Sequence, residues 1–388
     1  MHLETSTYYA LGVPLYALLM LAEAWLGRRR GQRVYRVADD LSNLACGMGQ
    51  ILAGLALGPV MIALYRIGYD LRLLSLPAKS PLTWVASALL VDLCYYFYHR
   101  AGHRLRVLWA VHQVHHQSDG FNFAVALRQP WVSDLYAVFF YFPLPLLGVP
   151  LEVFFACVAA LSLNQITLHT RLLPRPGAGI FNTPQLHELH HAKNAPYADK
   201  NFGATLIIWD RLFGTYQARD PGVAPELGIA EGYTTHDSVR AQWLGARDIA
   251  RDLRGASSLR HGWRAVFGAP ASAPTAAVRA PASDSIPRAT KLVSLVAFAA
   301  ITGAATALLL FQARLSTAQL ACGAVALVAA LHLIGAALDS NRVRAEGTVR
   351  ARAVIPHRMR PCYAPSHEAP LVAPRARVRH RRMRLFQR

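Results

Sequence analysis

The stretch LTWVASALLVDLCYYFYHRAGH, residues 82–103, joins two features that decide the fold of this chain. As far as Tyr98 it is apolar, with Asp92 as its one charged side chain. An apolar helix of about 20 residues is long enough to cross the roughly 30 Å hydrocarbon core of a membrane. The stretch then ends in His99 and His103, which share one face of a helix because they lie four residues apart. It therefore predicts a membrane-spanning helix that continues into a pair of candidate metal ligands.

Comparable apolar runs occupy much of the remaining chain, which is 53% apolar and only 16% charged. They lie at residues 8–26, 41–65, 131–149, 151–168, 292–311 and 318–338. We read the first run as a retained span because no Lys or Arg precedes it and positive charge follows it. The runs 131–149 and 151–168 are separated only by Pro150 and predict a helical hairpin, with complete and partial crossing both left open. The chain is thus expected to be an all-α, polytopic membrane helical bundle with a cytoplasmic histidine-rich cap.

The formal net charge of +19 is unevenly distributed. Arg28, Arg29, Arg30 and Arg33 follow the first run, and short basic loops stay on the cytoplasmic side of a membrane. Counting spans forward from that loop places the histidines on the same side, and we expect a multi-pass protein of the cell inner membrane. Residues 341–388 contain thirteen Arg, no Lys and two Glu, which makes +11 of the +19. Because most of the excess positive charge lies in this tail, we expect no nucleic-acid partner. The tail either attracts anionic lipid headgroups or has no function.

Nine of the sixteen histidines fall between residues 99 and 191. They form three histidine boxes, one spaced i, i+4 and two spaced i, i+3, i+4, with one further histidine at the end of an apolar run. The set is His99, His103, His112, His115, His116, His169, His187, His190 and His191. A single box is more often an ordinary surface pair, but three of them so close together predict a metal site. Because four ligands close the shell of a tetrahedral ion, nine imidazoles indicate two ions; imidazole suits Zn, Cu, Fe and Ni alike.

Carboxylates near the boxes are candidates for supporting the ligands, because a ligand histidine usually donates its other N–H group to a carboxylate or a carbonyl oxygen. Asp92, Asp199 and Asp210 are the candidates for this role. Asp92 lies two helical turns before His99 on the same face, and its alternative role is that of a structural partner for a tyrosine hydroxyl or a neighbouring helix. Glu188 stands between two ligands, and we expect its side chain to face away from the metals.

Longer stretches around the histidines carry a family resemblance. They are residues 92–103, 108–116, 126–129, 168–170, 182–191, 199–203 and 206–215. In this order, and beside spanning helices, they resemble the fatty acid hydroxylase and sterol desaturase superfamily of membrane di-iron oxygenases, in particular its alkylglycerol monooxygenase branch. The resemblance implies that the nine histidines bind two iron ions, with zinc as an alternative in the purified protein. It implies no catalytic residue beyond these ligands.

The same resemblance implies a reaction. O2 would be the cosubstrate, a membrane lipid the substrate, and a separate protein or small molecule the electron donor, since the sequence shows no haem-binding or flavin-binding domain. The expected outcome is hydroxylation or desaturation of a C–H bond. The alkylglycerol monooxygenase branch cleaves an ether bond with tetrahydropterin as reductant, but that branch has Glu directly after the second histidine of the first box, where Arg104 stands here. The reversed charge argues against the pterin and the ether substrate and leaves the metal site intact.

These patterns predict the organisation of the chain. N-terminal transmembrane helices (1–80) precede a fatty acid hydroxylase-type catalytic core (81–217) and cytoplasmic or interfacial helices (218–267). An Ala/Pro-rich linker (268–290), a C-terminal pair of transmembrane helices (291–339) and an Arg-rich tail expected to be disordered (340–388) follow.

Two other functions compete with the oxygenase. A zinc-dependent membrane hydrolase would need an activating Glu next to a ligand, which Glu188 alone could supply. A catalytically silent metal-binding membrane protein would have kept the fold without turnover, although nine intact ligands argue against a degenerate site.

Overall fold

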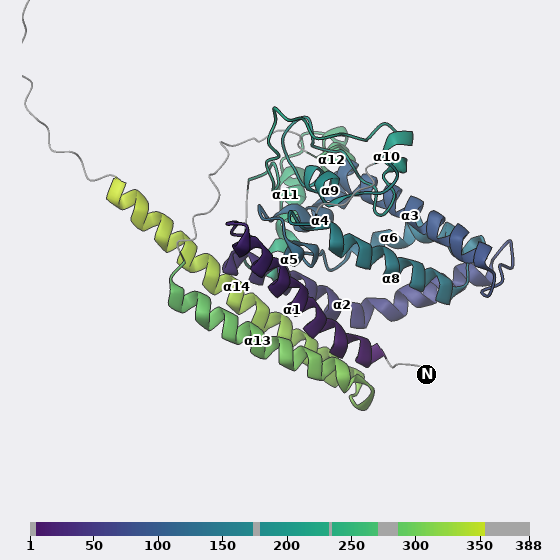
Figure 1. Ribbon diagram of the computed structural model, residues 1–388, viewed down its shortest axis with the longest axis horizontal. Helices are drawn as coiled ribbons and strands as arrows, with labels where there is room; N and C mark the ends of the chain where they lie inside the picture. The colour runs from purple at the N-terminus through teal and green to yellow at the C-terminus, as the bar shows by residue number, and fades with distance from the viewer. Residues whose placement is uncertain (1–4, 174–178, 233–234, 271–285, 354–388) are drawn as a thin grey trace, which may run out of the picture. The chain divides into compact units, whose positions relative to one another are not determined.

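The computed structural model describes residues 5–173, 179–232, 235–270 and 286–353. Throughout these ranges the regular secondary structure is helical, and the only paired extended residues form two isolated bridges, Phe181 with Leu206 and Ala192 with Leu227. The prediction of an all-α fold is therefore confirmed (Figure 1). All of the contacts discussed below lie within the compact unit Met1–Glu346.

Long helices cover most of the predicted apolar runs. They are α1 (Thr5–Arg29), α2 (Val37–Asp70), α3 (Pro81–Arg104), α8 (Leu151–Leu168), α13 (Arg288–Leu310) and α14 (Thr317–Ala353). Four segments of the described chain are long and apolar enough to cross a membrane, namely Val37–Asp70, Leu151–Leu168, Arg288–Leu310 and Thr317–Ser340. Apolar side chains such as Leu292, Val293 and Val296 of α13 are exposed, as lipid-facing residues would be. The chain is an integral membrane protein.

The predicted spans 8–26 and 82–98 correspond to α1 and α3, which are not among these four segments. The count of crossings that placed the histidines on the cytoplasmic side included these two helices and is therefore not reproduced by the four candidate spans. The side of the membrane on which the histidines lie stays a prediction.

Two short helices divide the predicted span 131–149. α6 (Ser133–Tyr141) has nine residues and α7 (Pro143–Leu146) has four. Proline lacks the N–H group that continues a helix, and its ring clashes with the preceding turn, so Pro143 and Pro145 interrupt the helical ladder. At about 1.5 Å per residue, α6 is about 14 Å long, which is less than half of the hydrocarbon thickness. Of the two arms of the predicted hairpin, only α8 is long enough to cross.

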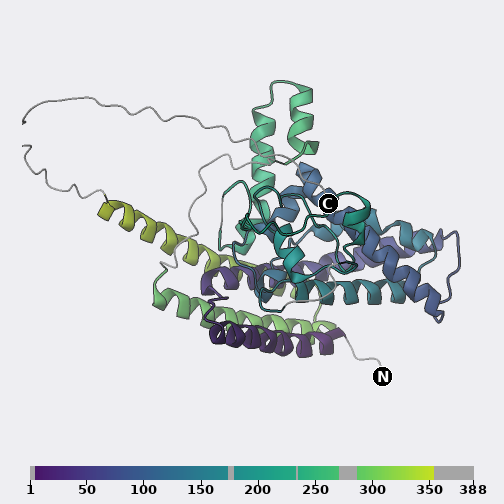
Figure 2. The ribbon, with the colours of Figure 1, turned by 45° about the horizontal axis from the view of Figure 1, so that its top comes forward.

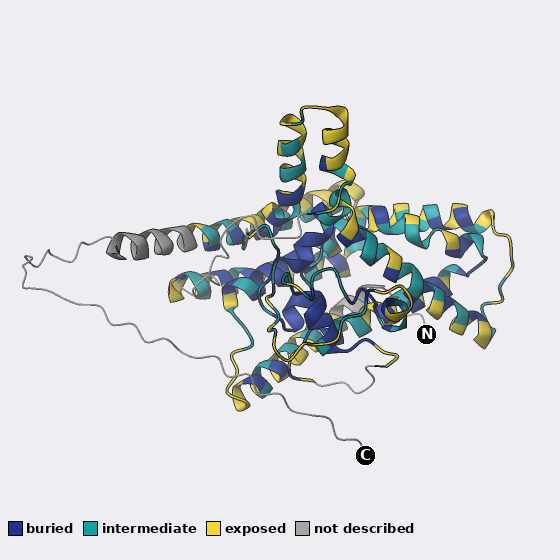
Figure 3. Cartoon of the chain, turned by 90° about the horizontal axis from the view of Figure 1, so that it is seen from above, coloured by how far each residue is buried: buried dark blue, intermediate teal, exposed yellow. Residues whose placement is uncertain are grey.

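Shorter helices form the cap that holds the histidines. α4 (Arg106–His116) packs against α3 and α11 (Ser238–Arg254), and α9 (Pro184–His190) packs against α8. The other short elements are α5 (Phe123–Ala126), α10 (Ile208–Leu212), α12 (Leu259–Phe267) and the 3-10 helix η1 (Gln312–Arg314). Buried residues gather where the histidine-bearing helices meet (Figure 3).

Helices α11 and α12 form a hairpin that extends away from the other helices of the cap (Figure 2). Trp243, Leu259 and Trp263 are exposed on it, between several arginines. Exposed aromatic rings on a basic amphipathic helix are typical of a helix lying in the membrane interface. Its placement in that interface stays a prediction.

The linker and the tail are only partly covered by the structure. Residues 271–285 of the predicted linker and residues 354–388 of the predicted Arg-rich tail lie outside the described residues. α14 continues to Ala353, past the boundary predicted at residue 339.

Candidate metal centre

The candidate ligands stand near the ends of four helices. The C-terminal turns of α3 supply two of them and the C-terminal half of α4 supplies three. The C-terminal ends of α8 and α9 supply the other four. α9 begins where Thr183 accepts a hydrogen bond from the N–H group of Leu186 at 3.3 Å, with Pro184 in its first turn. All nine histidine side chains are buried, with exposed fractions between 1% and 6%.

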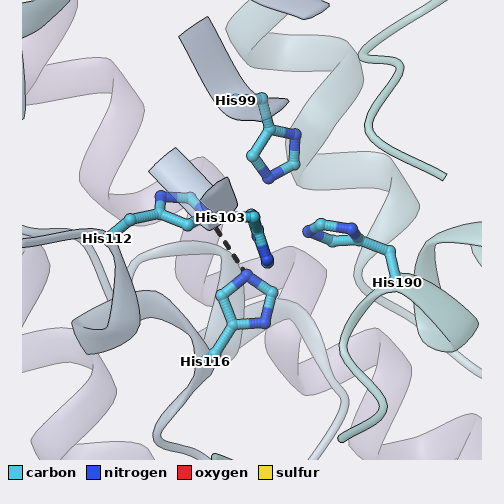
Figure 4. A group of neighbouring side chains, drawn as sticks. All are labelled: His99, His103, His112, His116 and His190. Carbon is cyan, nitrogen blue, oxygen red and sulfur yellow. Dashed lines mark hydrogen bonds between the residues drawn. The ribbon is translucent and has the colours of Figure 1, made fainter. Parts of the chain in front are cut away.

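The structure brings the nine rings together in two groups. Group one consists of His99, His103, His112, His116 and His190 (Figure 4), and group two consists of His115, His169, His187 and His191. Within each group, one ligand atom from every ring lies within 4.8 Å of the others. The two groups are neighbours, since the ring centroids of His116 and His191 are 4.4 Å apart. The arrangement provides one position with five imidazoles beside another with four.

Each three-histidine box contributes to both groups. In α4, His112 and His116 belong to group one, whereas His115 belongs to group two. In the box of α9 the assignment is reversed, because the i, i+4 pair belongs to group two and His190 belongs to group one. Residues four apart on a helix share one face, and the residue at i+3 stands at the edge of that face. One short helix can therefore supply ligands to two positions.

The distances between ring nitrogens are those expected of ligands to one ion. The Nε2 atoms of His112 and His116 are 3.2 Å apart. The Nε2 atom of His187 lies 3.1 Å from that of His169 and 3.3 Å from that of His191. Nitrogens bound to one ion at about 2.1 Å lie about 3.0 to 3.4 Å apart when their two bonds enclose an angle of about 90° to 110°. The rings of each group thus fit a metal ion.

Unpaired nitrogens in group one lead to the same conclusion. The Nε2 atoms of His99, His103 and His190 are buried and have no hydrogen-bond partner in the described part of the chain. Buried polar atoms are rarely left without a partner. These rings converge on one another (Figure 4), and a cation between them would satisfy all three lone pairs.

Backbone carbonyl groups fix the orientation of several rings. The Nδ1–H group of His99 donates to Phe202 O at 2.8 Å, and that of His190 donates to Lys200 O at 2.9 Å. Equivalent bonds in group two run from His115 to Arg128 O at 3.1 Å and from His169 to Gln165 O at 2.8 Å. With Nδ1 as the donor, Nε2 carries the lone pair that a metal needs.

Burial keeps these rings uncharged at neutral pH. It lowers the pKa of His190 and of His169 to about 3 and that of His115 to about 4, because an imidazolium ion loses its hydration in the interior. Neutral imidazole is the form that binds a metal ion. The folded protein therefore has no proton to remove from these rings before a metal binds at pH 7.

The metal-free protein is expected to lose stability when the pH falls from 7.5 to 5.5. In the unfolded chain these three histidines have ordinary pKa values of about 6.5 and take up protons in this range, whereas in the folded protein they stay neutral. Because the unfolded state then binds more protons than the folded state, the free energy of unfolding falls by about 1 kcal/mol for each ring. Thermal denaturation of chelator-treated protein in detergent measures the change.

A variant lacking an exposed histidine, His261→Ala on α12, is the control for this experiment, and it should show the same loss of stability as the unchanged protein. A Tm that is equal at the two pH values would contradict the prediction.

Asp199 is the predicted supporting carboxylate that lies beside a ring. Its Oδ1 atom is 3.5 Å from Nδ1 of His103, and its Oδ2 atom is 3.7 Å from Nη1 of Arg104. The positive charge of Arg104, where the alkylglycerol monooxygenase branch is expected to have Glu, is therefore partly offset next to group one.

Asp210 and Asp92 act on a loop instead of on the rings. Asp210 accepts hydrogen bonds from the N–H groups of Phe202 at 2.8 Å and Gly203 at 2.7 Å, next to the carbonyl group that holds His99. Asp92 accepts from the N–H group of Thr205 and from the indole of Trp209, both at 2.8 Å. Both carboxylates fix the backbone that presents its carbonyl groups to group one.

We expect Asp210→Asn to weaken metal binding in group one by about tenfold, the lower end of the loss caused by removing an outer partner of a metal ligand. Asparagine keeps the shape of aspartate but replaces one of the two acceptor oxygens with an NH2 group, so one N–H group of the loop loses its partner. Metal titration of the chelated protein measures the affinity. Asp220→Asn, at an exposed turn where the carboxylate accepts from Gly222 N–H, is the control and should leave the affinity unchanged. Equal affinities for the two variants would contradict a positioning role for Asp210.

Glu188 faces away from the rings. Its Oε1 atom accepts from Nε of Arg171 at 2.7 Å, and its Oε2 atom lies 3.4 Å from Nη1 of Arg219. Both oxygens of Glu188 are bound by arginines and not turned towards the rings, so the zinc hydrolase loses the one candidate for its activating group.

Arg128 supports the site, although no role could be assigned to it from the sequence. Its guanidinium group is buried and donates to Val114 O, Ser42 Oγ, Asn43 Oδ1 and Gln117 Oε1 at 2.8 to 3.1 Å. These bonds join α2 to α4 and hold the backbone carbonyl group that accepts from His115. The motif at 126–129 was visible in the sequence, but partners such as Ser42, 86 positions away, were not.

The fold and the two groups define a class of protein, a helical membrane protein with adjacent imidazole positions able to hold metal ions. Residues 84–215, which include all nine histidines, match the family model of fatty acid hydroxylase. The family resemblance predicted from the histidine boxes is confirmed.

Several characterised proteins are similar to the chain. It is 36% identical to an alkylglycerol monooxygenase of Xenopus tropicalis over 55% of its own length and 47% of that protein. The human alkylglycerol monooxygenase is 33% identical over 62% of this chain and 54% of its own. An ornithine lipid hydroxylase of Rhizobium tropici is 27% identical over 56% of this chain and 67% of its own. The chain thus spans about half the length of the alkylglycerol monooxygenases that it matches, and no solved structure matches it.

Proposed function

We propose that this protein is an O2-dependent lipid hydroxylase whose nine buried histidines hold two iron ions, one in each group. The observation that carries the proposal is the pair of adjacent imidazole groups inside the fatty acid hydroxylase domain. In the overall reaction one oxygen atom of O2 enters a C–H bond and the other leaves as water, with two electrons and two protons from a separate donor and solvent. Bound iron supplies the activation of O2, which no protein side chain provides.

The chain's own contribution is ligand geometry, charge and exclusion of water. Neutral rings leave the charge of the bound cations uncancelled, which favours anionic oxygen species at the site. Asp199 lies beside group one, and its distance of 3.5 Å from His103 leaves the ring orientation mainly to backbone carbonyl groups. Burial of all nine rings limits the access of water, which protects a strong oxidant from side reactions.

A small cavity reaches group one from the side of the cap. It has a volume of about 60 Å³ and is bordered by rings of group one together with Trp109, Lys193 and Asp199. The cavity has room for water and O2. We expect the lipid to approach the site from the membrane.

A test with isotopically labelled O2 separates the oxygenase from its rivals. The purified protein, loaded with iron and reduced, should consume O2 and transfer one labelled oxygen atom from 18O2 to lipid extracted from its host. Metal analysis of the same sample should give about two iron ions per chain. Zinc as the only metal, with no O2 consumption after reduction, would favour the hydrolase. Iron without any labelled lipid product would favour a silent metal-binding protein.

Cleavage of an alkylglycerol ether is the second candidate, because alkylglycerol monooxygenases are among the most similar proteins found. Hydroxylation of the carbon next to the ether oxygen would give an unstable product that releases an aldehyde. Incubation with an alkylglycerol and a tetrahydropterin tests this. A fatty aldehyde as product would establish the ether substrate despite Arg104, whereas a stable alcohol on an ester lipid would establish simple hydroxylation.

The location of the site completes the proposal. The basic loop of Arg28, Arg29 and Arg30 favours the cytoplasmic side of the cell inner membrane for the end of α1. Arg30 donates to Leu172 O at 2.7 Å, three residues beyond His169. The end of α1 and group two are thus on the same side. Modification of a cysteine introduced beside Arg30 by a membrane-impermeant reagent, in intact cells and in inverted vesicles, tests the side.

A further inference from the structure

A second cavity lies next to group two and plays no part in holding the metals. Its volume is about 370 Å³, and Thr170, Arg171, Gln185, Glu188 and Arg219 are among its lining residues. Thr170 directly follows the ligand His169, and Glu188 directly follows the ligand His187. The cavity therefore lies along the chain segments that carry group two.

The two arginines of this cavity are held in place by Glu188 and, among the described residues, each gives one N–H group to it. Glu188 is buried and binds Nε of Arg171 with one oxygen and Nη1 of Arg219 with the other. Both arginine side chains are 49% exposed. A guanidinium group has five N–H donors in a planar fork, and each arginine uses one of them here for Glu188. Two arginines against one carboxylate leave a positive charge at the mouth of an open cavity.

The cavity also lies where the membrane ends. α8 is a candidate span that ends at Leu168, and Arg171 follows three residues later. Thr170 donates a hydrogen bond to Glu23 of α1, so the wall of the cavity is attached to the end of a second long helix. Cationic side chains at this depth meet the headgroups of the lipid layer.

We propose that Arg171 and Arg219 bind the phosphate group of a membrane lipid headgroup. Arginine forks match the tetrahedral oxygens of phosphate, and paired charge-assisted bonds make such contacts strong. The buried carboxylate of Glu188 binds both guanidinium groups and keeps them at the cavity. The proposal rests on the function proposed above only for the role of the bound lipid as the substrate, since binding itself needs no metal.

Binding of two lipids that differ only in the phosphate group tests the proposal. The detergent-purified, full-length protein is titrated with dioleoyl phosphatidate and with dioleoylglycerol. Phosphatidate should bind about 100-fold more tightly, because each of the two arginines is expected to contribute about tenfold through one charge-assisted bond. Arg171→Gln and Arg219→Gln should each remove about tenfold of that preference and leave binding of dioleoylglycerol unchanged. Arg251→Gln is the control, because Arg251 is also exposed and paired with a carboxylate, Asp248, at 3.1 Å.

Equal affinity for the two lipids, or an equal loss in the Arg251→Gln variant, would overturn the proposal. If the glutamine variant does not fold, Arg171→Lys replaces it, because lysine keeps the charge but lacks the planar guanidinium group. This variant should keep part of the preference for phosphatidate. An unchanged preference would count against recognition by the guanidinium group. Inorganic phosphate distinguishes the source of the phosphate group. Failure of millimolar phosphate to displace phosphatidate identifies the lipid, and full displacement identifies free phosphate as the ligand. Since the titration needs no iron, loss of the proposed oxygenase activity would leave its result intact.

Discussion

Replacing His190 with alanine is expected to reduce the iron content from about two ions per chain to about one and to lower product formation at least about 100-fold. His190 belongs to group one alone, and its Nε2 atom is one of three buried nitrogens there that have no hydrogen-bond partner among the described residues. Loss of an outer partner of a ligand already costs about 10- to 100-fold, so loss of a direct ligand should cost more. Elemental analysis and transfer of label from 18O2 to lipid measure the two effects.

His187→Ala is the complementary variant, because His187 belongs to group two alone. It should lose the other iron ion, so that each variant keeps one ion and neither makes product. His261→Ala removes an exposed histidine of α12 and is the matched control, with two ions and full activity expected. Two ions per chain in both ligand variants would contradict the assignment of these rings as metal ligands.

Replacing Arg128 with methionine should destabilise the protein by about 3 to 5 kcal/mol, because each buried polar group left without a partner costs about 1 to 3 kcal/mol. Methionine fills much of the same space but donates no hydrogen bond, so four neutral acceptors lose this donor at once. The carbonyl group of residue 128 would then no longer be held, and the ring of His115 would lose its fixed orientation. We therefore expect a lower Tm together with loss of metal from group two.

Thermal denaturation in detergent and metal titration check this result. Arg264→Met, at an exposed position on α12, should change neither the Tm nor the metal content. The Tm and metal content of Arg128→Lys should lie between those of Arg128→Met and the unchanged protein, because lysine keeps the charge but offers a single ammonium group in place of the guanidinium group. A methionine variant as stable as the unchanged protein would show that the network contributes little.

The order of elements along the chain could be predicted to a large extent. Apolar runs of helical length indicated the long helices, and histidine spacing indicated nine candidate ligands, all of which the structure places in the two groups. The sequence left complete and partial crossing open where local chemistry interrupts an apolar run. Pro143 and Pro145 divide 131–149 into two helices too short to cross, which hydropathy alone does not register.

Supporting contacts could not be predicted in the same way. Asp92 was a candidate support for His99 because it shares a helix face, with a structural role as the alternative, and its carboxylate is turned to Thr205 and Trp209 of a distant loop. Asp210 likewise acts through the backbone of that loop. A helix face predicts direction, but which partner lies in that direction depends on how distant segments pack.

By itself, the sequence determined which residues can bind a metal and that they stand on helices, because ligand chemistry and helical periodicity are local properties. The tertiary structure alone decided how the nine rings divide into five and four, that Arg128 joins α2 to α4, and that Glu188 braces two arginines beside a cavity. These are distances between segments far apart in the chain. They are fixed by the packing of helices, whose angles and offsets no local pattern encodes.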